Sequence, residues 1–193
     1  MHLARVLRTS THLPAQRAFV SPSPRFHATM AASLTPPVPI VLIGLHTEIG
    51  APVAEGLRPD YDIVRFIQTF EAAKTDLPYL LQGSAPPDPP INSVGSEDYS
   101  RGPVRAVLFG RGFSQQQAET LYGLYNNEAK ADRVLWVAGA EAHRKSGKVG
   151  AEPPPNPEKI IVPIFRSLLE DWKKKVESGD EAGTEEGKGV VLY

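Results

Sequence analysis

Apolar residues in the first two thirds of the chain gather into short runs separated by polar or glycine-rich stretches. The run PIVLIG at 39–44 has the length of one strand and contains no charged or hydrogen-bonding side chain. Continuous apolar runs of this length are typical of strands buried on both faces of a parallel sheet. Three further strands are predicted at 61–69, 104–110 and 133–139.

A short helix is predicted after the first strand, at 51–57. Pro52 lacks a backbone N–H group, and proline is tolerated only in the first turn of a helix. We therefore expect this helix to begin near Gly50 and not at Thr47.

Two more helices separate the remaining strands. One is expected at 70–82, interrupted or restarted around Asp76 and Pro78. The other opens at Ser114, which forms an S-x-x-Q capping box with Gln117. This box satisfies two backbone N–H groups at a helix start, so that start is well specified.

The last third of the chain contains one long amphipathic segment. Its apolar residues recur at steps of three and four and predict a stripe that faces the core: Ile160, Ile161, Ile164, Phe165, Leu168, Leu169, Trp172 and Val176. Pro163 leaves two interpretations open, because it either kinks the helix or starts it after a short strand at 159–162. The acidic stretch 177–188 is predicted to be a solvated loop, and GVVLY at 189–193 is long enough for an edge strand.

Strands that alternate with helices at this spacing predict an α/β three-layer sandwich with a mainly parallel sheet and right-handed crossovers. The expected strand order is 2-1-3-4, with the C-terminal strand added at an edge. Two stretches rich in proline and glycine, at 83–103 and 147–157, form long loops. Loops of such length are usually either functional or disordered.

The first 47 residues contain no acidic side chain, and their charged residues are Arg5, Arg8, Arg17 and Arg25. Such N-termini resemble mitochondrial transit peptides. We expect residues 1–37 to be an N-terminal extension, and 38–193 to be one α/β domain. The extension is a presequence for the mitochondrial matrix if translation begins at Met1. The alternatives are a disordered extension, or a start at Met30 that leaves the protein in the cytoplasm.

Composition excludes several classes of partner and site. The 21 basic and 22 acidic residues leave a formal charge of −1, which gives no reason to expect nucleic acid as a partner. The absence of cysteine excludes disulfides and thiolate metal sites, and no histidine–carboxylate cluster has metal-ligand spacing. The longest apolar run, 38–45, falls short of the roughly 18 residues that a membrane span needs, so we expect a soluble protein.

Ligands of parallel α/β sheets bind beyond the carboxyl ends of the strands, where the strand order reverses. In the expected order this point lies between the loops after the first and third strands. It brings GLHTEIG at 44–50 opposite GRGFS at 110–114, and both loops open helices whose free N–H groups favour an anion. The predicted binding residues are Gly44, Gly50, Gly110, Arg111, Gly112 and Ser114.

Over residues 38–139 this architecture resembles the Rossmann-like NAD(P)-binding superfamily. The resemblance implies NAD or NADP as the cofactor, held by a G-x-G-x-x-G turn. Here Gly44 and Gly50 are present, the middle glycine is missing, and Glu48 lies where the phosphates would be and would repel them. The acidic residue that holds the ribose in that family is also absent from the end of the second strand, which reads FIQT.

Two functional hypotheses follow. The first is a small protein that binds a nucleotide or another anionic small molecule, as a degenerate NAD(P)-dependent oxidoreductase, with His46 or His143 as acid or base and Arg111 as the anion ligand. The second is a non-catalytic interaction or assembly protein that uses the loop at 83–103 or the C-terminal helix and strand. An exposed terminal strand can pair with a second chain, so a homodimer is included.

Overall fold

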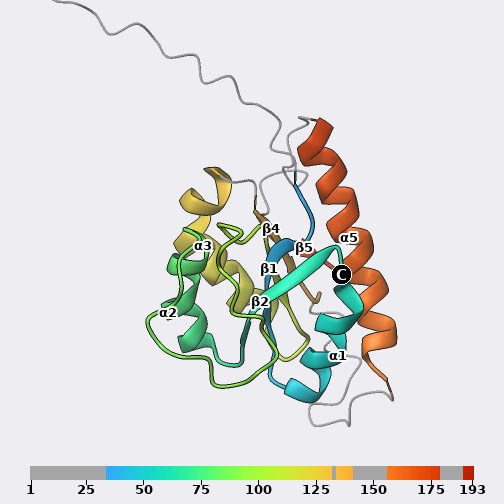
Figure 1. Ribbon diagram of the computed structural model, residues 1–193, viewed down its shortest axis with the longest axis horizontal. Helices are drawn as coiled ribbons and strands as arrows, with labels where there is room; N and C mark the ends of the chain where they lie inside the picture. The colour runs from blue at the N-terminus through green and yellow to red at the C-terminus, as the bar shows by residue number, and fades with distance from the viewer. Residues whose placement is uncertain (1–33, 132–133, 141–155, 179–188) are drawn as a thin grey trace, which may run out of the picture. The chain divides into compact units, whose positions relative to one another are not determined.

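The computed structural model describes residues 34–131, 134–140, 156–178 and 189–193. In these residues five strands alternate with four helices (Figure 1). Their bounds are β1 (Val38–Ile43), α1 (Thr47–Leu57), β2 (Tyr61–Ile67), α2 (Phe70–Leu80), β3 (Ala106–Phe109), α3 (Gln115–Ala131), β4 (Leu135–Ala138), α5 (Glu158–Ser178) and β5 (Val191–Leu192). The predicted presequence up to residue 33, His143 and most of the loop at 147–157 lie outside the described residues.

All five strands are parallel, and their order across the sheet is β2-β1-β3-β4-β5. The predicted α/β class, the order 2-1-3-4 and the C-terminal edge strand are therefore confirmed. Every residue of β1 and β2 is buried, as expected for strands covered on both faces; β1 is a continuous apolar run, whereas β2 also buries Asp62 and Arg65. The core also includes Leu34, which is 7% exposed, so the compact part begins earlier than the expected residue 38.

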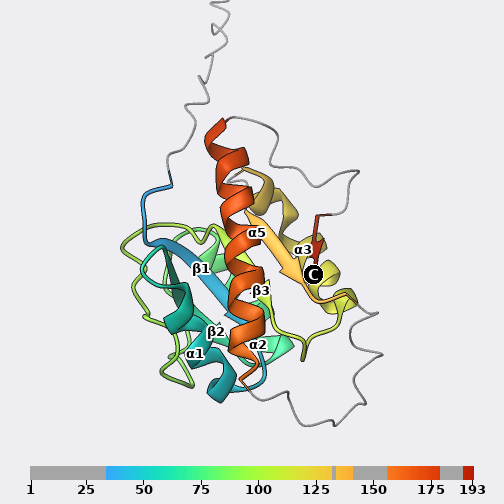
Figure 2. The same cartoon turned by 90° about the vertical axis from the view of Figure 1, so that its right-hand side faces the viewer.

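Helices cover both faces of the sheet and complete the three layers. α1 and α5 lie on one face, as Figure 2 shows from that side, and their apolar residues pack on residues of β1, β3 and β4. The predicted stripe of α5 supplies four buried side chains to this core, namely Phe165, Leu169, Trp172 and Val176. On the other face α2 and α3 cover the sheet, and Leu77, Leu80, Ala118 and Leu121 pack on strand residues such as Val107 and Trp136.

The crossover through α5 has the opposite hand to the crossover through α3. The steps from β3 to β4 and from β4 to β5 run in the same direction across the sheet, yet α3 and α5 lie on opposite faces. The expectation of right-handed crossovers throughout is therefore wrong for the last one. The physical reason is that both faces of the sheet must be covered. α2 and α3 already cover one face, whereas without α5 the eleven-residue α1 would be the only described helix on the other.

Three helices contain a proline. α2 continues through Pro78, so the predicted interruption around Asp76 and Pro78 is wrong. The prolines of α1 and α5 lie deeper inside their helices than expected. α1 begins at Thr47, so Pro52 occupies its sixth position, and the predicted start near Gly50 is wrong. α5 begins at Glu158 and contains Pro163, which excludes the strand considered at 159–162. In α1 and α5 proline removes a single hydrogen bond, to a carbonyl in the first turn, and packing of the rest of the helix on the sheet outweighs this local loss.

The long loop after α2 is ordered and covers the free edge of β2. The N–H groups of Ser96 and Glu97 donate to the carbonyls of Ile63 and Val64 at 2.9 and 3.0 Å. Edge strands expose unpaired backbone groups that invite pairing with other chains. Here the loop satisfies these groups, and it runs alongside β2 (Figure 1).

Candidate functional site

The turn after β1 is shaped by the ring of Phe66, which lies on β2 and is 3% exposed. A Cβ atom at Gly50 would lie 2.7 Å from Phe66 Cε2, and one at Gly44 would lie 3.2 Å from it. Contacts under 3.0 Å force a neighbour to move, so only glycine fits at position 50 without a shift. The two glycines predicted to bind a cofactor thus have a packing role that requires no ligand.

The first turn of α1 carries its own anion. The N-cap residue His46 makes no side-chain capping bond, and Glu48 lies in the first turn. The hydrogen bond from its own backbone N–H lowers the pKa of the Glu48 carboxyl. Burial opposes this shift, and the charge and hydrogen bond of the nearby His46 lower the pKa further. His46 Nδ1 lies 3.0 Å from Glu48 Oε1. The positive end of α1 is therefore already paired with a carboxylate.

The turn after β3 meets the β1 turn, as predicted, because the Gly110 N–H donates to the Ile43 carbonyl at 2.8 Å. The predicted capping box of α3 is present: the Gln117 N–H donates to Ser114 Oγ at 3.1 Å, and the Ser114 N–H donates to Gln117 Oε1 at 2.8 Å. The Ser114 N–H group is thus occupied within the box.

Leu45, which is 46% exposed, packs against the β3 turn at Gly112. A Cβ atom at Gly112 would lie 2.6 Å from Leu45 Cδ1, whereas one at Gly110 would meet its nearest atom at 3.5 Å. Gly112 therefore makes room for Leu45, and the switch point between β1 and β3 holds an apolar side chain of the protein itself.

Arg111 lies beside the C-terminal strand. Tyr193 donates a hydrogen bond from its hydroxyl to the Phe109 carbonyl at 3.1 Å. Burial raises the pKa of this hydroxyl, and the adjacent Arg111 guanidinium opposes that shift through its charge and a hydrogen bond. Arg111 is exposed and oriented by Tyr193, so it can meet an anion at this edge of the sheet.

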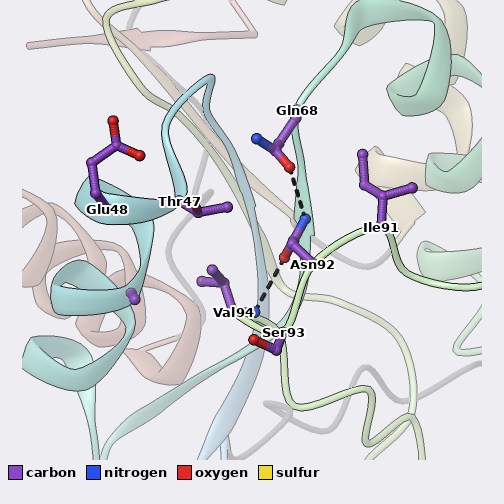
Figure 3. A pocket seen from close by; sticks show the side chains of 8 residues that line it. Thr47, Glu48, Gln68, Ile91, Asn92, Ser93 and Val94 are labelled. Carbon is purple, nitrogen blue, oxygen red and sulfur yellow. Dashed lines mark hydrogen bonds between the residues drawn. The ribbon is translucent and has the colours of Figure 1, made fainter.

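An open depression of about 580 Å³ lies at the carboxyl ends of β1 and β2, on the other side of the β1 turn from α3. Its volume is within the range of roughly 300–1,000 Å³ that is usual for small-molecule sites. The first turns of α1 form one wall and the loop at 91–94 forms the other (Figure 3). The lining residues are Thr47, Glu48, Ala51, Gln68, Ile91, Asn92, Ser93 and Val94.

The side-chain amides of Asn92 and Gln68 hold the loop at 91–94 in place beside this depression. Asn92 Nδ2 donates to the Phe66 carbonyl at 3.1 Å and to Gln68 Oε1 at 3.2 Å, and Asn92 Oδ1 accepts from the Val94 N–H at 3.1 Å (Figure 3). Gln68 Nε2 in turn donates to the Leu45 carbonyl at 2.9 Å. The amides therefore fix the loop at 91–94 to both the β1 and the β2 ends.

A buried guanidinium holds the same loop from below. Arg65 on β2 is 5% exposed; its Nε donates to Asp76 on α2 and its Nη1 to Glu97, both at 2.9 Å, while its Nη2 donates to the Asp88 carbonyl at 3.0 Å. Tyr99 also donates to Glu97. Since Asp88 and Glu97 flank the loop at 91–94, Arg65 closes that loop at its base.

Sequence reasoning placed a site at this edge of the sheet but missed the depression. Of the residues that line it, only Glu48 was considered, and as an obstacle to phosphate. The depression joins three segments that are distant in sequence, and no local pattern indicates that 91–94 lies beside α1. One signal was available: the length of the 83–103 loop, which marked it as functional or disordered.

The described residues contain no group of three or more histidine, aspartate or glutamate side chains that could hold a metal ion. Within the same part of the chain, no helix has the length and apolar character needed to cross a membrane. No family model matches the chain, and neither a curated protein nor a solved structure matches it.

Proposed function

We propose that this protein binds a small molecule through a ribonucleoside group, seated in the depression between the start of α1 and the loop at 91–94. The observation that carries the proposal is an open depression at the carboxyl ends of β1 and β2 that is lined by both polar and apolar side chains. The nucleoside belongs to a free nucleoside or to a nucleotide, and the adenosine part of NAD or NADP is included.

Position supports the proposal. Ligands of open parallel sheets bind outside the carboxyl ends of the strands, and in dinucleotide-binding sheets a polar group near the end of the second strand holds the ribose. Gln68 directly follows β2 and lines the depression. The role of this position in holding a ribose is inferred by analogy of fold.

The chemistry of the walls supports a ligand that is both hydroxylated and partly apolar. The Glu48 carboxylate accepts hydrogen bonds only, as the recognition of a sugar diol requires, and the Thr47 and Ser93 hydroxyls can donate or accept. Ile91, 73% exposed, and Val94 offer apolar surface to a flat base. Glu48 from α1 would thus take the place of the acid that is missing at the end of β2.

The test is ligand-dependent stabilisation. Adenosine, guanosine, cytidine and uridine, with NAD and NADP, are added in excess while the melting temperature is followed, and hits are confirmed by calorimetry. A ligand that binds only the folded protein raises its melting temperature by mass action. We expect at least one nucleoside to do so, and no stabilisation by any of the six compounds would refute the proposal.

A matched pair of variants localises the binding. Ile91→Ser removes the exposed apolar side chain at the rim, whereas Ile160→Ser makes the same change on α5, where the side chain is 48% exposed. Binding in the depression predicts a weaker ligand affinity for the first variant and an unchanged affinity for the second.

One observation favours the second candidate function, assembly with another chain. The loop at 83–103 covers the β2 edge, whereas among the described residues β5 pairs only with β4, and Leu192 on β5 is 40% exposed. Pairing of β5 with β5 of a second copy would cover this edge as a homodimer. The solution mass tests it: a dimer that Leu192→Lys converts to a monomer supports assembly, and a wild-type monomer at all concentrations contradicts it.

A further inference from the structure

We infer that the depression discriminates against phosphate, so that its ligand is a nucleoside and not the corresponding phosphate ester, and that the Glu48 carboxylate is the specificity-determining group. This inference rests on the proposed function, because it concerns the same site. It reverses the expectation that the glycine turn after β1 serves an anionic ligand.

The position of Glu48 disfavours a phosphate group in the depression. Its carboxylate occupies the first turn of α1, where a phosphate would otherwise meet free N–H groups and the positive end of the helix. Its side chain is 71% exposed and lines the depression at the α1 rim, on the far side from the loop at 91–94 (Figure 3). A second anion there would meet a like charge.

The charge of the lining also disfavours a phosphate. Among the eight residues that line the depression, Glu48 alone carries a charge, and the others are aliphatic, hydroxyl or amide side chains. Specific phosphate sites usually combine backbone N–H groups with arginine or lysine. Arg111 belongs to the β3 turn, where it contacts Tyr193, and Leu45 packs on Gly112 of that turn.

The side-chain amides of Asn92 and Gln68 already take part in hydrogen bonds within the protein. Asn92 Nδ2 already donates to Phe66 and Gln68, and Gln68 Nε2 donates to Leu45. Both bonds of the Asn92 amide nitrogen and one N–H group of Gln68 are therefore engaged in holding the walls, which leaves the Thr47 and Ser93 hydroxyls as neutral donors. By contrast, ribose hydroxyls can donate to Glu48 without displacing any of these bonds.

The experiment compares each of the four common ribonucleosides with its 5′-monophosphate, by calorimetry on the wild type, Glu48→Gln, Glu48→Asp and Glu55→Gln. Glu55 lies on the same helix, is exposed and faces no part of the depression, so it controls for net charge. Glu48→Gln removes the charge and keeps the size, and Glu48→Asp keeps the charge.

The wild type should bind its preferred nucleoside at least about fivefold more tightly than the monophosphate, as expected for one like-charge contact near water. Glu48→Gln should shift this preference about fivefold toward the monophosphate and so abolish it, because the repulsion is lost while glutamine keeps an acceptor oxygen for the ribose hydroxyls. Glu48→Asp and Glu55→Gln should retain it, and about 1 M salt should reduce it because charges are then screened within ~3 Å.

The outcomes separate the two proposals. If neither nucleosides nor monophosphates bind the wild type, the proposed function fails. If both bind with equal affinity, or if Glu48→Gln leaves their ratio unchanged, nucleoside binding stands and the selection by Glu48 is overturned.

Discussion

The two walls of the depression are held in place by different physics. The α1 wall, which consists of Thr47, Glu48 and Ala51, is positioned by close packing, since Gly50 lies against the ring of Phe66. The loop wall at 91–94 is positioned by directional bonds, from the amide of Asn92 and from the buried guanidinium of Arg65.

The difference shows why the sequence could not reveal the packing role of Gly50 in the α1 wall and why the loop wall was not predicted. A glycine that makes room for a ring and one that admits a phosphate have the same sequence signature. A loop tied by a buried charge has no periodic pattern at all. The two kinds of support also respond differently to substitution, which allows the comparison to be tested.

The largest loss in the free energy of unfolding is expected when a contact that holds the loop wall is removed. Arg65→Met leaves Asp76, which is 3% exposed, and Glu97 without their cation. Removing one partner of a buried ion pair costs about 3–5 kcal/mol, so the free energy of unfolding measured in urea should fall by that amount.

Arg58→Met is the matched control for Arg65. Arg58 is 53% exposed in its side chain and lies 3.9 Å from Asp62, which makes a weak surface pair. Its replacement should change the free energy of unfolding by less than about 0.5 kcal/mol. Equal losses in the two variants would show that burial of Arg65 does not matter.

The next effect concerns the α1 wall. Gly50→Ala brings a Cβ atom against the Phe66 ring and should lower the free energy of unfolding by about 1–3 kcal/mol through overpacking. In a Phe66→Leu background the same change should become neutral or stabilising by up to about 1 kcal/mol, because alanine is the better helix former. A double-mutant cycle measures this reversal.

Gly110→Ala serves as the control for that cycle. The nearest atom to its Cβ would be the Ile43 carbonyl oxygen at 3.5 Å, an ordinary contact. Its free energy of unfolding should therefore stay close to the wild-type value, and a large loss would contradict the packing argument.

Asn92→Ala should have a smaller effect that is local to the loop wall. It removes two donated bonds and one accepted bond of a partly buried amide, which corresponds to about 1–2 kcal/mol. Hydrogen exchange should accelerate at the Val94 N–H, which loses its acceptor. Ser93→Ala, an exposed neighbour that lines the same depression, should leave both measurements unchanged.

The smallest expected effect is a gain in stability, at the N-cap of α1. His46 occupies the N-cap position of α1 with extended backbone angles and makes no capping bond, whereas Thr69 caps α2 through its hydroxyl at 3.1 Å. His46→Ser should therefore stabilise the protein by about 0.5–1 kcal/mol, and Thr69→Ala should destabilise it by a similar amount. Thermal unfolding measures both, and a loss of stability on His46→Ser would mean that the His46–Glu48 pair outweighs a cap.

Much of the fold could be predicted because its determinants are local. The apolar runs at β1, β2, β3 and β4 indicated buried parallel strands, and Ser114 with Gln117 marked the start of α3. The start of α1 was predicted wrongly because the rule applied to Pro52 counts a single lost hydrogen bond and ignores the packing gained along the rest of the helix.

The candidate site could be predicted only in part. Its edge of the sheet followed from strand order, but its walls depend on contacts such as Asn92 with Phe66 and Arg65 with Glu97, which join residues 26 and 32 positions apart. Side-chain pairs at that separation leave no periodic trace in the sequence.

The sequence by itself determined that this chain forms a parallel α/β sheet, with its strand order, its terminal edge strand and the face of α5 that enters the core. Hydrophobic periodicity indicates burial because most buried positions are apolar. Only the tertiary structure decided that Gly44 and Gly50 accommodate Phe66, that Leu45 packs on Gly112 and that the open depression lies beside β2. These outcomes depend on which side chains meet across the sheet, and steric fit between distant residues is settled only once the chain has folded.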